Sequence, residues 1–117
     1  MDILITNNPL VHAQYQGKMT VEYIETDLSG ILTKVRDSIH KGHRLLTHPL
    51  MGSVKPNESP YKSVLITKAH ENTDVQSVSI IEECILTAQK FAPKSIPEKY
   101  LNDLQMVDLS LIRTALE

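Results

Sequence analysis

The sequence feature that most constrains the fold is the segment 47–62, which reads THPLMGSVKPNESPYK. It separates the apolar runs 45–46 and 64–66, and it contains three prolines. Proline fixes φ, lacks a backbone donor and restricts the residue before it, so this segment disfavours a continuous helix or a central strand. Connections of this length are usually functional or disordered. The proline content favours a stiff loop that holds polar groups in place, and we predict a site there.

The composition is typical of a globular domain. The chain has 117 residues, of which 41% are apolar and 22% charged, and this size is sufficient for a single domain over residues 1–117. A net charge of −2 and an aromatic content of 4% disfavour nucleic-acid binding, which relies on basic patches and base stacking. No apolar run reaches the ~20 residues of a membrane span, and the opening MDILIT lacks the basic start of a signal peptide. We therefore expect a cytoplasmic protein with no membrane segment.

Strand and helix patterns alternate along the first half of the chain. Apolar runs and apolar–polar alternation predict four strands, over residues 3–5, 21–24, 44–47 and 63–67. Helical periodicity predicts helices over residues 9–16, 28–41 and 74–91, and further short ones that begin near Pro97 and Asp108. This order is typical of an α/β layered domain. We expect a small, mostly parallel sheet of about four strands flanked by helices, with a helical C-terminal third; the direction of the fourth strand stays open.

Capping signals accompany three of these helices. Asn8 before Pro9 matches an N-cap followed by proline at the first helical position. Gly42 is a typical stop signal for the helix expected over residues 28–41. Thr73 and Gln76 have the spacing of a capping box.

Polar residues that follow the expected strands are the candidates for a binding site. Ligands of open α/β sheets usually bind beyond the carboxyl ends of the strands. If the first and third expected strands are neighbours, the residues after them converge on one edge, and two lysines of the 47–62 loop add positive charge. Such an edge suits a small anion, either a carboxylate or a phosphate. The candidate ligand-binding residues are Asn7, Asn8, Thr47, His48, Ser53, Lys55, Asn57 and Lys62.

Each candidate also has an ordinary structural explanation. Asn7 and Asn8 are favoured caps and turn residues in any protein. His48 can bond to the backbone of its own loop, although a side chain that titrates near neutrality can also act as a general acid or base. Lys55 and Lys62 have the character of solvated surface lysines.

Metal, thiol and cofactor chemistry have weaker support. His40, His43 and His48 are close in sequence, but Gly42 should end the helix between them and no zincin motif is present, so we expect no metal site. The single cysteine, Cys84, lies on an apolar helical face, where we expect a small buried hydrophobe. The chain has no Rossmann, Walker or nucleophile-elbow signature, and we expect no cofactor.

Several blocks of the sequence resemble the GrdX family. They are ILITNNP at 3–9, VRDSIHKGH at 35–43 and LLTHPLMGSVKPNE at 45–58, followed by shorter matches at 60–63 and 108–112. GrdX proteins are small proteins encoded beside the components of glycine, sarcosine and betaine reductases in anaerobic, amino-acid-fermenting bacteria. The resemblance implies a link to that system and assigns no catalytic residue. Its densest block coincides with the loop chosen above on physical grounds.

Three functions follow as hypotheses. The first is an accessory protein of the glycine reductase system, which binds a reductase component or a small anionic metabolite near Asn7, Asn8 and the 47–62 loop. The second is a small enzyme with His48 as general acid or base. The third is a purely structural assembly module. The ligand, the oligomeric state and the question of catalysis stay open.

Overall fold

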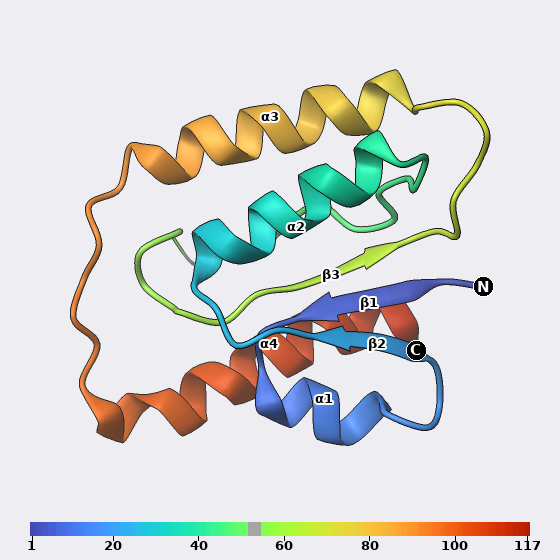
Figure 1. Cartoon of the computed structure of the whole chain (residues 1–117). Coiled ribbons are helices and arrows are strands. Elements are labelled where there is room, and N and C mark those ends of the chain that lie inside the picture. Colours follow the sequence, from blue (N-terminus) through green and yellow to red (C-terminus); the bar gives the residue numbers. More distant parts are fainter. Residues whose placement is uncertain (52–54) are drawn as a thin grey trace.

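The computed structural model describes residues 1–51 and 55–117 (Figure 1). Its sheet consists of β1 (Ile3–Thr6), β2 (Thr20–Tyr23) and β3 (Ser63–Ile66). The helices are α1 (Pro9–Tyr15), α2 (Leu28–His40), α3 (Val75–Gln89) and α4 (Leu101–Leu116), with a short 3₁₀ helix η1 (Glu98–Tyr100) before α4. Within the described ranges, none of the helices combines the length and the apolarity needed to span a bilayer.

The sheet is mixed, with the strand order β2-β1-β3. The central strand β1 is parallel to β2 and antiparallel to β3, with Leu4 opposite both Val21 and Leu65. The expectation of an α/β domain is confirmed, whereas the expectation of about four mostly parallel strands is wrong. The crossover through α1 makes β2 parallel to β1, but β3 leaves the long loop in the opposite direction.

Residues 44–47, the third expected strand, do not form one. They lie along β3, with a single isolated bridge between Leu45 and Ile66. The N–H groups of Leu46 and Thr47 both donate to the carbonyl oxygen of Leu65, at 2.9 and 3.3 Å. The Leu65 N–H in turn donates to the Thr47 hydroxyl oxygen (3.0 Å) and not to a backbone carbonyl. A side chain thus replaces the backbone in the ladder, which is why the strand stops.

Helices cover both faces of the sheet (Figure 1). Leu4 and Leu65 pack with residues of α1 and α4, whereas Ile5 and Val64 pack with residues of α2 and α3. Successive side chains of a strand point to opposite faces, so this alternation divides the core into two clusters. The apolar face of α2 contributes four residues to the cluster on the α2 and α3 side, more than any other element.

Local signals placed most of the helix ends correctly. The Asn8 side chain accepts a hydrogen bond from the Leu10 N–H, and Pro9 is the first residue of α1, as predicted. Gly42 follows α2 with φ of 104°, and a Cβ there would lie 2.1 Å from the His70 carbonyl oxygen, so this turn requires glycine. At α3, Asp74 is the N-cap, one residue after the Thr73 of the expected capping box.

The C-terminal third is helical, as expected, but its last helix begins earlier than predicted. Asp108 was expected to cap a short final helix, and that expectation is wrong. The helix α4 begins at Leu101, directly after η1, and Asp108 is a buried residue in its middle. Asp108 does not cap its own helix because its carboxylate accepts hydrogen bonds from other elements, namely from Ser63 of β3 and from Asn8 before α1.

Candidate functional site

Asn7 attaches the end of the 47–62 loop to the end of β1. Its Oδ1 accepts a hydrogen bond from the Lys62 N–H (2.8 Å), while its Nδ2 donates to the carbonyl oxygens of Pro60 (2.7 Å) and Thr26 (2.8 Å). The end of the loop therefore reaches the end of β1. The expected arrangement, in which residues 44–47 pair with the first strand and bring Thr47 and His48 to Asn7, does not occur, because β3 lies between β1 and residues 44–47. Both side-chain amide hydrogens of Asn7 are thus used internally, one by the loop at Pro60 and one by Thr26 before α2, while Oδ1 holds the backbone of Lys62.

Asn8 belongs to a buried chain of hydrogen bonds that ends at Asp108. The Asn8 N–H donates to the Thr6 hydroxyl (3.0 Å), the Thr6 and Ser63 hydroxyl oxygens are 2.7 Å apart, and the Ser63 hydroxyl donates to Asp108 Oδ2 (2.7 Å). Because Ser63 gives its only proton to Asp108, Thr6 must donate to Ser63. Asn8 Nδ2 donates to the same Asp108 oxygen, at 3.0 Å. This chain fixes α4 against the ends of β1 and β3.

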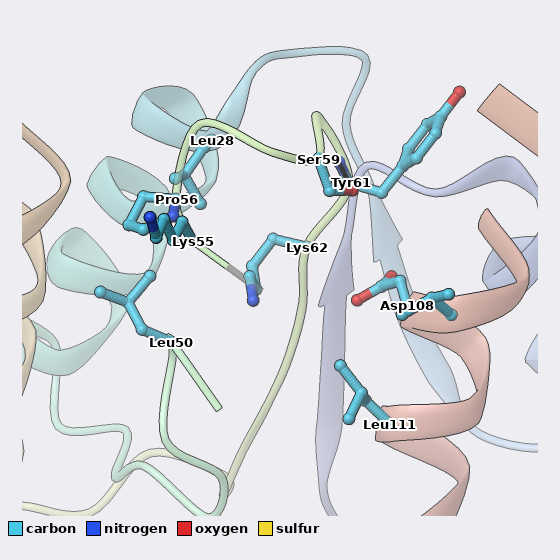
Figure 2. A pocket seen from close by; sticks show the side chains of 10 residues that line it. Leu28, Leu50, Lys55, Pro56, Ser59, Tyr61, Lys62, Asp108 and Leu111 are labelled. Carbon is cyan, nitrogen blue, oxygen red and sulfur yellow. Dashed lines mark hydrogen bonds between the residues drawn. The ribbon is translucent and has the colours of Figure 1, made fainter. Parts of the chain in front are cut away.

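A small pocket opens where β3, α4 and the 55–62 part of the loop meet (Figure 2). Its cavity volume is about 20 Å³, slightly more than one water needs, and its mouth is open to solvent. Apolar walls come from α2, α4 and the loop. The charged residues that line it are Lys55, Lys62 and Asp108.

Lys62 is the half-buried cation of this pocket. Lys62 directly precedes Ser63, whose hydroxyl faces α4. Figure 2 shows the Lys62 amine on the opposite side of the chain from Asp108, on the side where Leu50 and Lys55 lie. Burial lowers the pKa of the Lys62 amine, and the smaller opposing effects come from Asp108 and Cys84. Among the described residues no ion pair includes Lys62. A partly desolvated ammonium without a counter-ion is costly, so this position favours an anionic ligand or a neutral amine.

His48 lies outside this pocket, against Cys84 of α3. Its Nδ1 accepts a hydrogen bond from the Leu50 N–H (3.1 Å), and its Nε2 lies 4.0 Å from the Cys84 sulfur. A neutral imidazole that accepts at Nδ1 carries its proton on Nε2, so in this arrangement His48 cannot take a proton from the thiol. Burial raises the pKa of the Cys84 thiol. Cys84 is buried in the core, as expected.

A second, larger pocket lies on the other side of the same loop. Its volume is about 430 Å³, within the range of small-molecule sites, and its walls are mostly apolar side chains of α2, α3 and the 91–96 connection. Asn57 lines it, and Asn57 Nδ2 donates to the carbonyl oxygen of Ala92 (2.8 Å). The two pockets share Leu28, Pro56 and Ser59.

The structure thus separates the candidate residues into groups. Lys55 and Lys62 share the small pocket, whereas Asn57 lines the larger one. Asn7, Asn8 and Thr47 are buried and bonded to the backbone around them. Ser53 lies outside the described residues.

Asp108 is the pocket residue that sequence reasoning missed. A signal was present, because Asp108 follows Leu104 by four residues and precedes Leu111 by three, so a carboxylate lies in the apolar stripe of a helix. A charge at such a position is rarely buried without partners.

The histidines that are close in sequence do not share a site among the described residues. The Nδ1 of His43 donates to the Thr67 carbonyl oxygen (2.7 Å).

A family model described as GrdX-like protein matches residues 3–117, which is nearly the whole chain. The chain belongs to the GrdX-like protein family. The match includes both pockets and the loop between them, so the site geometry described above lies entirely within the region that defines GrdX-like proteins. Searches of curated proteins and of solved structures found no match.

Proposed function

We propose that this GrdX-like protein is an accessory protein of the glycine reductase system and that it binds a small anionic metabolite in the pocket of Lys55 and Lys62. The observation that carries the ligand class is the half-buried Lys62 amine, which has no ion-pair partner among the described residues. The link to the reductase system rests on the family.

Three features support an anion at this position. The Lys62 amine loses hydration on burial, and an anion replaces that hydration with a charge-assisted hydrogen bond. The exposed Lys55 lines the mouth of the same pocket, where it adds positive potential. Asn7 holds the Lys62 backbone from both sides, since its N–H donates to the Lys62 carbonyl oxygen (3.3 Å) and its Oδ1 accepts from the Lys62 N–H. The backbone from which the Lys62 side chain extends is therefore held in place before a ligand arrives.

The pocket also limits the size of the ligand. A cavity of about 20 Å³ receives little more than one oxygen of a carboxylate or phosphate group and leaves the rest of the molecule at the solvent-exposed mouth. Phosphate, acetyl phosphate and the carboxylate groups of glycine and sarcosine are therefore the first candidates.

Isothermal titration of the wild type and two lysine variants tests this proposal. We expect Lys62→Met to weaken binding of the tightest of these four ligands by about tenfold or more, because a charge-assisted hydrogen bond contributes about 1.5–3 kcal/mol. Lys55→Met should have a smaller effect. Lys68→Met, at an exposed lysine outside both pockets, is the matched control and should bind normally. Equal affinity in the wild type and Lys62→Met would refute the proposed site.

Partner binding needs a separate experiment. We expect tagged protein in a glycine-fermenting cell to recover a component of the reductase. If repeated pull-downs recover no such component, the accessory role loses its support, while the anion site stays testable by titration. We do not extend the proposal to acid–base catalysis by His48, because its Nδ1 accepts from Leu50 and its Nε2 faces the buried Cys84.

A further inference from the structure

The same pocket supports a chemical reaction as well as binding. An ammonium that is partly removed from water and lacks a counter-ion tends to lose its proton. The neutral amine of lysine is a nucleophile that attacks carbonyl carbon to form a Schiff base, and a second nearby cation favours that neutral form. Lys62 is the half-buried amine of the pocket, where burial outweighs the opposing charge of Asp108, and Lys55 is an exposed cation that lines the same pocket.

We propose that Lys62 forms a Schiff base with a small 2-oxo acid, whose carboxylate pairs with Lys55. This inference rests on the proposed function, because it assigns the anion of that site to a class of compound. Among small anions, a 2-oxo acid carries both the negative charge that the two lysines attract and an electrophilic carbon beside it. The small cavity favours the shortest members of this class.

The reaction is balanced without a cofactor. The lone pair of Lys62 Nζ adds to the carbonyl carbon, the carbonyl oxygen takes up a proton, and the nitrogen loses one to water. The resulting hydroxyl then leaves as water when it is protonated from solvent, the C=N bond forms, and the nitrogen releases its second proton to solvent. One amine and one carbonyl compound thus yield one imine and one water. No oxidation or reduction takes place.

The geometry of the pocket matches these needs. Figure 2 shows the Lys62 amine pointing into the pocket beside Leu50, with the Lys55 side chain near Pro56 on the same side. The apolar Leu28 and Leu50 line this part of the pocket, so they shield the amine from bulk water. The mouth stays open, and both substrate and the released water can pass.

Reductive trapping tests this proposal directly. The wild-type protein is incubated with glyoxylate and sodium cyanoborohydride, which converts an imine into a stable secondary amine, and the modified lysines are located by peptide mass spectrometry. We expect Lys62 to be labelled at least about tenfold faster than the exposed Lys68 and Lys90, since a reactant held beside its nucleophile reacts much faster than a free one. Acetaldehyde, which lacks the carboxylate, should lose most of this selectivity.

Variants separate this inference from simple anion binding. Lys62→Met should remove the fast-labelled site and leave the labelling of Lys68 and Lys90 unchanged. Lys55→Met should reduce the preference for glyoxylate over acetaldehyde while Lys62 is still labelled. If glyoxylate labels Lys62 no faster than the exposed lysines, the Schiff base is overturned. If titration nevertheless finds an anion that Lys62→Met binds more weakly, the proposed function stands without it.

Discussion

At the scale of single residues, the side chain of Asp108 connects elements that are far apart in the sequence. One of its oxygens accepts hydrogen bonds from Ser63 (2.7 Å) and from Asn8 (3.0 Å), so a carboxylate on α4 joins the beginning of β3 to the cap of α1. A paired buried polar group contributes only modestly to the free energy of unfolding, but when its partner is removed the protein loses the full desolvation energy of that group. The stability of this corner therefore depends on one side chain.

We predict that Asp108→Ala lowers the free energy of unfolding by about 2–3 kcal/mol, because it leaves buried donors of Ser63 and Asn8 without their acceptor. Urea denaturation followed by circular dichroism measures this value. Asp103→Ala, at an exposed position of the same helix, is the control and should change stability by less than about 0.5 kcal/mol. Equal effects of the two substitutions would argue against the hydrogen-bond chain.

At the scale of elements, the segment 44–47 demonstrates how a strand pattern fails to become a strand. Its residues reach the correct edge of β3, and the Thr67 N–H donates to the Arg44 carbonyl oxygen (2.9 Å). The ladder then ends because the Thr47 hydroxyl takes the place of a backbone acceptor for the Leu65 N–H. Residues 44–47 therefore cover the edge of the sheet at β3, and the chain leaves the sheet at Thr47 to form the 47–62 loop. Local strand propensity predicted that residues 44–47 are extended, but it did not predict that the pairing ends at Thr47.

We predict that Thr47→Val destabilises the protein by about 1–2 kcal/mol. The substitution keeps the shape of the side chain and removes the oxygen, so the buried Leu65 N–H loses its acceptor. Hydrogen exchange should detect faster exchange at the Leu65 amide in particular. Thr114→Val, on the exposed face of α4, serves as control. Unchanged protection at Leu65 would mean that its N–H finds another acceptor.

At the scale of the whole molecule, the small pocket lies where the two helical layers approach the same edge of the sheet. Charged or titratable groups of both layers influence Lys62: Asp108 of α4 and Cys84 of α3 both raise its pKa slightly against the effect of burial. Burial lowers the pKa of Lys62 below its ordinary value of 10.5. Between that lowered pKa and 10.5, the unfolded chain binds more protons than the folded one, so the contribution of Lys62 to stability rises with pH.

We predict that Lys62→Met removes this rise. Measured as the difference between wild type and variant, the free energy of unfolding should favour the wild type increasingly as pH increases towards 10. The comparison by difference is needed because burial raises the pKa values of Cys84, Tyr15 and Tyr23, which lowers stability at alkaline pH in both proteins. Lys68→Met should follow the wild type. A pH-independent difference for Lys62→Met would contradict the assignment of the lowered pKa.

Part of the candidate site could be read from the chain, and part could not. The 47–62 loop was identified because its prolines exclude regular structure, and both pockets have walls from residues 55–62. Lys55 and Lys62 were identified as possible charges of one site, which they line together. The convergence of Asn7 with His48 was not found, because the Asn7 amide contacts residues 60 and 62 while His48 turns towards α3. Residues of one loop, such as His48 and Lys62, can therefore contact different elements.

The sequence by itself determined the helices α1 to α3, the cap at Asn8, the stop at Gly42 and the first two strands, since these depend on periodicity and on hydrogen bonds within a few residues. It also determined the family. Only the tertiary structure decided the antiparallel direction of β3, the interruption at Thr47 and the interior position of Asp108. These features depend on contacts such as that between Ser63 and Asp108, 45 residues apart, and no local pattern records which distant partner a polar side chain will find.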